Sequence, residues 1–418
     1  MTVNFERIER FLNYLLVFLL PTQIAFHFWP ASAFVFGIRV DYLAPSVYLT
    51  DILFLILFGV WFSGHHKNFL SLINKHKTLI LLFLLIAVIN IVFSFSVLPT
   101  VYKWIKTIEM AAFAFYVWAR RDIFGSRAVY ESLYLSLIFF SLIGIAQFFK
   151  GGTLGGILYY MGERSFSLST PGIALVSLWG RSFLRAYSTL PHPNAFAGFL
   201  GAGMLILWGH YSKKSFSKKI PGLVIISLGF LLTFSLAAFL TAILCAAVYW
   251  MYLKKFFTKS NLFLFVLAFF LVSLLLPVVS GWLQSLGITY GESVSQRLDL
   301  AVVSGSIISH RFLVGSGLNT FIIEEARGVL TNSHYWLLQP VHNIYLLVMS
   351  EVGIGGLLLL YFLFSKILGG LLYRRNTGIF LAVIFIMITG LFDHYWFTLQ
   401  QNLLLLGLLI GKALSVES

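Results

Sequence analysis

Apolar stretches as long as a lipid bilayer is thick constrain this chain more than any other feature. A transmembrane helix takes about 20 consecutive apolar residues, so the 418 residues have room for about twelve such helices. The apolar stretches lie at about 11–29, 47–63, 78–96, 101–118, 129–149, 192–210, 222–235, 236–253, 261–279, 342–363, 378–393 and 396–414. The segment from Gly222 to Leu253 allows either one long tilted helix or two short helices broken near Ser235.

The composition excludes the main soluble classes. Only 11% of the residues are charged and 59% are hydrophobic, whereas soluble domains carry about 25% charged residues. A water-soluble enzyme, a disordered chain and a nucleic-acid-binding domain are therefore ruled out. We expect an all-α polytopic membrane protein of about twelve transmembrane helices, with residues 1–418 forming a single transmembrane domain. A lone cysteine, Cys245, excludes an intrachain disulfide.

The basic residues indicate the orientation. The formal net charge is +14, and 19 of the 29 Lys and Arg residues fall in short inner loops if the chain starts in the cytoplasm. This is the positive-inside pattern, and it predicts that both termini are cytoplasmic. The ten remaining basic residues are Arg39, Lys103, Lys106, Lys150, Arg164, Arg181, Arg185, Arg297, Arg311 and Arg327.

Seven of these ten lie in two long outer segments, at 150–191 and 280–341. Long loops of this kind are usually functional. A guanidinium matches phosphate oxygens with two parallel hydrogen bonds, so an outer surface rich in arginine suggests a diphosphate ligand. We expect the second segment to be partly helical, with Arg297 and Arg311 on one face of a helix at about 295–312.

Three ionisable residues in the fourth stretch share a helix face: Lys103, Lys106 and Glu109. Pairing of Lys106 with Glu109 would leave Lys103, nearer the outer end, either to bind a phosphate or to extend toward the headgroups.

His342 stands at the start of the tenth stretch, where a neutral imidazole can accept a proton from a sugar hydroxyl near neutral pH. The alternative is a helix cap or an interfacial histidine. The outer acids do not form a D-x-D or E-x-D pattern, so we expect metal-independent chemistry. Phosphate-loop and dinucleotide fingerprints are also absent from the sequence, so neither ATP nor a nicotinamide cofactor is indicated.

Three sequence elements occur together in a fixed order. His342 and Asn343, with Gly353 and Gly356, read H-N-x9-G-x-x-G. Upstream, the stretch from Arg185 to Asn194 reads R-x-x-S-T-x-x-x-P-N, and residues 310–318 read H-R-F-L-V-G-S-G-L, with Arg297 about one helix length earlier. On a chain of about twelve spans, these elements resemble the bacterial O-antigen ligase and O-antigen polymerase superfamily.

The resemblance implies a C-type membrane glycosyltransferase fold and an inverting, metal-independent transfer without a cofactor. Such enzymes move a glycan from undecaprenyl diphosphate to an acceptor hydroxyl on the outer, periplasmic face of the bacterial inner membrane. By resemblance, His342 would be the general base or the group that positions the acceptor, and Arg185 and Arg297 would hold the diphosphate. The remaining candidates for substrate binding are Arg311, Lys103, Asn343 and Asn194. Arg311 departs from the family pattern, which has proline at this position.

Several functions remain open at this stage. The first is a ligase-like transfer to a glycolipid acceptor of the lipid A-core type, and the second is a polymerase that extends lipid-linked repeat units. A protein O-oligosaccharyltransferase is a lesser alternative because its relatives are usually longer. A polysaccharide or lipid transporter would place polar residues near the middle of the membrane and would show an internal repeat, whereas the polar signal here lies on the outer side.

Overall fold

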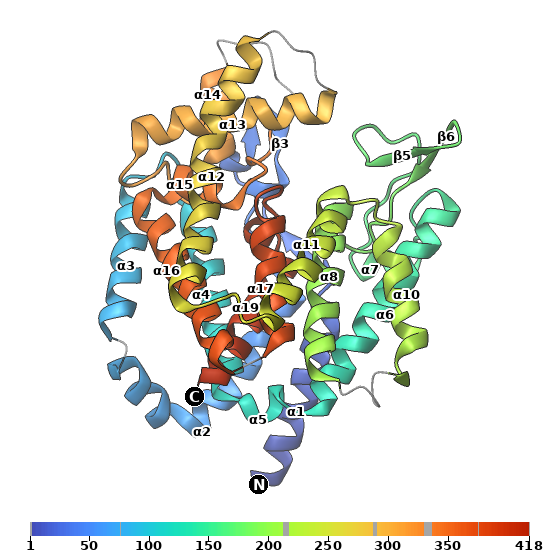
Figure 1. The fold of residues 1–418 in the computed structure, drawn as a ribbon, viewed down its shortest axis with the longest axis vertical. Helices are drawn as coiled ribbons and strands as arrows, with labels where there is room; N and C mark the ends of the chain where they lie inside the picture. Colours follow the sequence, from blue (N-terminus) through green and yellow to red (C-terminus); the bar gives the residue numbers. More distant parts are fainter. Residues whose placement is uncertain are drawn as a thin grey trace.

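The computed structural model describes residues 2–75, 77–211, 217–286, 291–329, 337–374 and 376–417. The protein is predominantly helical, and its long helices run between two ends (Figure 1). Both termini lie at the same end, which we call the inner end because the sequence predicts that it faces the cytoplasm. Parts of the second outer segment, 287–290 and 330–336, fall outside the described residues.

The described chain divides into the following helices. They are α1 (Thr2–Leu19), α2 (Leu49–Lys75), α3 (Lys77–Val92), α4 (Val97–Ala119), α5 (Arg121–Phe124), α6 (Arg127–Lys150), α7 (Ile157–Tyr160), α8 (Pro193–His210), α10 (Ile220–Leu231), α11 (Leu236–Leu253), α12 (Lys259–Ser285), α13 (Glu292–Arg311), α14 (Phe321–Val329), α15 (Ile344–Val352), α16 (Ile354–Arg374), α17 (Thr377–Thr389), α18 (Tyr395–Thr398) and α19 (Gln400–Glu417).

The helices agree with a membrane protein. Each predicted apolar stretch overlaps a helix. Among the described residues, four helices are long and apolar enough to cross a bilayer, namely those at Arg127–Lys150, Leu236–Leu253, Lys259–Ser285 and Ile354–Tyr373. Shorter apolar helices occur at Leu49–Gly64, Ile80–Val92, Ile220–Leu231 and Thr377–Thr389. The count of twelve crossings stays a prediction.

Two helix breaks refine the predicted spans. α10 and α11 are separate helices, divided at Leu232–Ser235, where Phe234 adopts a left-handed backbone with φ of 47°. The tenth span is also divided, because Gly353 has φ of 79° between α15 and α16. A Cβ atom at Gly353 would lie 2.4 Å from the backbone oxygen of Leu313, so only glycine fits this contact. The two glycine-containing elements of the sequence therefore pack directly against each other.

The all-α expectation is corrected by short antiparallel ribbons in the connection between α1 and α2 and in the first long outer segment. They pair β1 (Ala25–His27) with β4 (Ser46–Tyr48), β2 (Phe34–Val35) with β3 (Ile38–Arg39), and β5 (Leu175–Leu178) with β6 (Arg181–Leu184). The helix expected near 295–312 is confirmed as α13, which runs across the outer end of the bundle (Figure 1). The helix α12 continues to Ser285, so the second outer segment begins later than predicted.

The core is built around α17, in which every residue from Gly378 to Thr389 is buried. A helix that is apolar on all sides belongs in the interior of a bundle. Small residues allow the central helices to approach closely: a Cβ atom at Gly209 of α8 would lie 2.7 Å from the Cα atom of Gly378. A Cβ atom at Gly411 of α19 would lie 2.4 Å from the backbone oxygen of Ala114 in α4.

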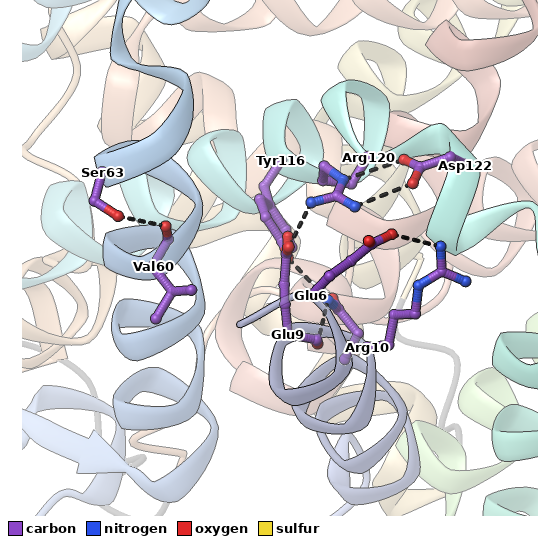
Figure 2. A network of polar contacts seen from close by, with 9 residues as sticks. Glu6, Glu9, Arg10, Val60, Ser63, Tyr116, Arg120 and Asp122 are labelled. Carbon is purple, nitrogen blue, oxygen red and sulfur yellow. Dashed lines mark hydrogen bonds and ion pairs between the residues drawn. The ribbon is translucent and has the colours of Figure 1, made fainter. Parts of the chain in front are cut away.

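A network of charged side chains joins α1 to α4 and α5 at the inner end (Figure 2). The guanidinium of Arg120 donates to the carboxylate of Glu9 and, at 3.0 Å, to that of Asp122. The hydroxyl of Tyr116 donates to the other Glu9 oxygen at 2.9 Å and accepts from the amide of Asn13 at 2.8 Å. Every charge in this network has a partner of opposite sign, so we interpret it as a structural clamp.

Candidate active site at the outer end

The site begins where α17 ends. Residues 390–394 form a short connection between α17 and α18 at the outer end, and Asp393 and His394 in it are both buried. Nδ1 of His342 lies 3.6 Å from Oδ1 of Asp393, and the two imidazole rings of His342 and His394 are 5.1 Å apart between centroids. The side chain of His342 is 18% exposed, so it is accessible to a substrate, whereas the side chain of Asp393 is buried behind it.

A chain of polar contacts connects His342 to Arg185: its first link is the 3.6 Å contact of His342 with Asp393, and the others are hydrogen bonds. The second carboxylate oxygen of Asp393 accepts from the amide nitrogen of Asn194 at 3.0 Å. The amide oxygen of Asn194 accepts from a terminal guanidinium nitrogen of Arg185 at 2.7 Å, and Nε of Arg185 donates to the backbone oxygen of Thr233 at 2.6 Å. These groups come from four parts of the chain, so the fold alone brings them together.

Arg297 is the second guanidinium of the site. It lies in the first half of α13 and is half-buried. Burial is the main cause of the lowered pKa values of Arg185 and His192, and the charge of Arg297 lowers both further, so Arg297 lies within electrostatic range of them. Within the described part of the chain, no carboxylate pairs with Arg297 or Arg185. Two unpaired guanidiniums in one place make a site for an anion.

The pKa values show which groups carry charge. Burial lowers the pKa of His192 to about 4 and that of His394 to about 3, so both imidazoles are neutral near pH 7. Burial alone would raise the pKa of Asp393, but contacts with His342, His394 and His192 outweigh it and hold the pKa well below its ordinary value. The site therefore combines one buried carboxylate with the cations Arg185 and Arg297.

Lys103 joins the site from the opposite side. Its ammonium donates to the backbone oxygen of Thr398 at 3.3 Å, and the hydroxyl of Thr398 lies 2.8 Å from Nδ1 of His394. The predicted pairing of Lys106 with Glu109 is confirmed at 3.2 Å, and Lys106 also bonds to Asp51. Lys103 thus approaches the site as one more cation without a carboxylate partner among the described residues.

Two of the predicted residues hold the scaffold. Asn343 is 1% exposed and caps α15: its side-chain oxygen accepts from the backbone nitrogens of Tyr345 and Leu346 at 2.9 and 3.0 Å. Its side-chain nitrogen donates to Ser273 and to the backbone of Leu391. Asn194 is likewise buried, bonded on both sides as described above. Their hydrogen bonds position His342 and Arg185 and leave little room for a substrate contact.

Arg311 lies apart from this group. It ends α13, fourteen residues after Arg297, and a helix rises 1.5 Å per residue, so about 21 Å of helix separates the two positions. Its guanidinium lies over the ring of Phe95, 4.3 Å from the centroid. The structure therefore unites His342, Arg185, Arg297, Asn194 and Lys103, and excludes Arg311 from the same cluster.

Sequence reasoning assigned no role to Asp393 or His394. Both are visible in the sequence as an acid and a histidine between two apolar stretches, which is the signal that could have identified them. Together with His342 they place three potential ligand atoms within 4.8 Å of one another, an arrangement that can also hold a metal ion. Metal-independent chemistry, expected from the sequence, stays a prediction.

Part of the chain matches a known protein family. Residues 221–361 match the family model described as O-antigen ligase. This segment runs from α10 into α16 and includes Arg297, Arg311 and His342, whereas Arg185 and Asp393 lie outside it. No curated protein matches the sequence. The family match confirms the resemblance predicted from the three sequence elements.

Proposed function

We propose that the chain, which matches the O-antigen ligase family model over residues 221–361, transfers a glycan from undecaprenyl diphosphate to an acceptor hydroxyl. The observation that supports this most is the meeting of His342, backed by buried Asp393, with the unpaired guanidiniums of Arg185 and Arg297. A base beside an anion site is what displacement of a diphosphate by a hydroxyl requires.

The proposed reaction is an in-line displacement with inversion. The acceptor oxygen attacks the anomeric carbon, the bond from that carbon to the diphosphate oxygen breaks, and the lipid diphosphate leaves. With Nδ1 of His342 held toward Asp393, Nε2 takes the proton of the acceptor hydroxyl. Arg185 and Arg297 balance the negative charge that grows on the leaving diphosphate, a role that a metal ion has in other transferases.

The location and the acceptor are part of the same proposal. We place the site on the periplasmic face of a bacterial inner membrane and both termini in the cytoplasm, in agreement with the positive-inside count and with the position of both termini opposite α13 (Figure 1). The proposed acceptor is a glycolipid, which makes the reaction ligase-like. A polymerase would instead use a second lipid-linked repeat unit.

Transfer by the full-length protein in liposomes tests the proposal, with an undecaprenyl-diphosphate glycan as donor and with the two acceptors in separate arms. We expect product with the glycolipid acceptor, and a loss of about 100- to 10,000-fold for His342→Ala. His27→Ala, also on the outer side but outside the site, is the matched control and should keep the wild-type rate.

Three outcomes contradict parts of this mechanism. Full transfer by both His342→Ala and Arg297→Ala would refute the assigned roles. Product only with the second repeat unit would identify a polymerase. Loss of activity in EDTA, restored by adding back a divalent metal, would show that His342, Asp393 and His394 bind a metal ion.

A further inference from the structure

The Arg311 end of α13 forms a second basic site. Two guanidiniums lie against one aromatic ring there: Arg311 is 4.3 Å and Arg327 is 4.6 Å from the centroid of Phe95. About 21 Å of helix separates Arg311 from Arg297. A diphosphate bound at Arg297 therefore leaves the Arg311 end of the helix without a ligand.

The charges at this second site do not cancel. Arg327 pairs with Glu324 at 3.1 Å, while Arg311 has no ion-pair partner within the described part of the chain. The charges of both Arg327 and Arg311 act on the carboxylate of Glu324, so one negative charge faces two positive ones. An anion bound beside Arg311 and Arg327 would supply the missing negative charge.

Beside the two arginines is a cavity of about 300 Å³. Three separate parts of the chain line it: the β2 region with Phe34 and Phe36, the connection before α4 with Phe95, and α14 with Ile323 and Arg327. Its wall is mostly apolar, with Arg327 as the charged group. A cavity of this kind suits a ligand that is apolar at one end and anionic at the other.

Exposed apolar side chains near the cavity indicate that its ligand is a lipid. The residues that flank the Arg311–Phe95 contact are apolar and exposed: Phe93 is 53%, Phe312 is 50% and Leu313 is 72% exposed. Exposed apolar side chains of a membrane protein face lipid. The arginines thus lie at the border between the lipid-facing surface and the polar outer segments, where lipid phosphates are found.

We propose that Arg311, Arg327 and Phe95 bind a lipid-linked phosphate whose first apolar carbons enter the cavity lined by Phe34 and Phe36. In the reaction proposed above, this ligand is the phosphorylated anchor of the acceptor glycolipid, and that assignment rests on the proposed function. The anchor is held at one end of α13, and its sugar chain extends along the helix toward His342 and the donor.

Binding to the purified full-length protein tests the site without any transfer reaction. The probe is dihexanoyl phosphatidic acid, followed by calorimetric titration in a neutral detergent. We expect Arg311→Gln to weaken binding about tenfold, because one charge-assisted pair of hydrogen bonds is lost, and Arg311→Lys to weaken it less. Arg181→Gln removes an exposed outer arginine on β6 and should leave the affinity unchanged.

Two further probes separate the sources of the phosphate. Inorganic phosphate should bind at least tenfold more weakly than phosphatidic acid, and dihexanoyl phosphatidylcholine should bind more weakly as well, since its headgroup is neutral overall. Equal affinity for inorganic phosphate would refute a lipid site. Equal affinity of wild type and Arg311→Gln for phosphatidic acid would refute the role of Arg311.

The transfer assay then separates this inference from the proposed function. Arg311→Gln should raise KM for a phosphorylated glycolipid acceptor about tenfold, with kcat and donor KM unchanged, and dephosphorylation of the acceptor should abolish the difference. Phosphatidic acid binding without any transfer by the wild type would refute the proposed function and keep the lipid-phosphate site. Transfer with the same acceptor KM in both proteins would refute the assignment of the acceptor to this site.

Discussion

Arginines of the inner charged network and arginines of the candidate active site have different kinds of partner. At the inner end, Arg120 contacts the carboxylates of both Glu9 and Asp122, and Arg10 contacts Glu6 (Figure 2). At the outer end, Arg185 bonds to a neutral amide and a backbone carbonyl, and Arg297 has no carboxylate partner among the described residues. The comparison teaches that pairing, more than residue type or burial, separates a structural arginine from one available to an anionic ligand.

The largest expected effect is a loss of stability when an ion pair of the inner network is removed. Arg120→Gln leaves the Glu9 carboxylate buried without its cation, which costs about 3–5 kcal/mol of stability. Thermal unfolding in detergent should show a clear loss, while the transfer rate per folded molecule stays at the wild-type value. Arg10→Gln removes an exposed pair and should cost about 0–1 kcal/mol. If Arg120→Gln kept a normal melting temperature but lost activity, Arg120 would have a functional role and not a structural one.

At the unpaired end, the same substitution should have the opposite consequence. Arg297→Gln is expected to lower kcat about 100- to 1000-fold, because it removes charge that stabilises the leaving diphosphate, and to leave the melting temperature unchanged. Steady-state rates in liposomes and a melting curve measure the two quantities. Arg164→Gln serves as a matched control on the outer side. A destabilised protein with normal kcat would show that Arg297 is structural.

A third prediction concerns Asp393, the buried carboxylate that faces His342 in the candidate site. Asp393→Asn keeps the shape of the side chain but removes the charge that faces His342, and we expect kcat to fall about 10- to 100-fold with donor KM unchanged. Asp393→Glu should restore part of the rate, which a purely structural role would not predict. An unchanged kcat for Asp393→Asn would argue against a positioning role.

The smallest effect concerns Glu325, an outer carboxylate on α14 that is buried without a cation. Burial raises its pKa from 4.5 to about 8, so between these pH values the folded protein holds a proton that the unfolded chain has released. Stability should therefore fall as the pH rises through this window. Glu325→Gln should lose this dependence, shifting the melting temperature at pH 9 by the order of a degree or two relative to wild type. If the melting temperatures of wild type and Glu325→Gln changed in parallel from pH 6 to 9, this prediction would be wrong.

The sequence predicted those parts of the site that sit in recognisable spacings. His342, Arg185 and Arg297 belong to ordered elements, and α13 was expected from its periodicity. Asp393 could not be assigned in the same way, because its contacts with His342 and Asn194 join residues about 50 and 200 positions apart in the chain. No local pattern reports such a contact.

The helix breaks and the role of Asn343 could not be predicted from the sequence either, because they too depend on contacts between distant residues. The tenth span contains Ser350 and Glu351 but no proline to stop a helix, and the contact of Gly353 with Leu313 shows why the helix ends there. Asn343 reads as a substrate residue by its position beside His342. The structure shows that its amide is already fully engaged in the cap of α15.

The polar contacts that run from Arg185 through Asn194 and Asp393 to His342 have a thermodynamic consequence. An anion that draws Arg185 away from Asn194 changes what the Asn194 amide and then the Asp393 carboxylate can bond to. Since binding free energies are reciprocal, an acceptor that engages His342 must alter the affinity for the donor by the same factor. Donor and acceptor affinities in this protein should therefore be interdependent quantities, each defined only at a stated concentration of the other.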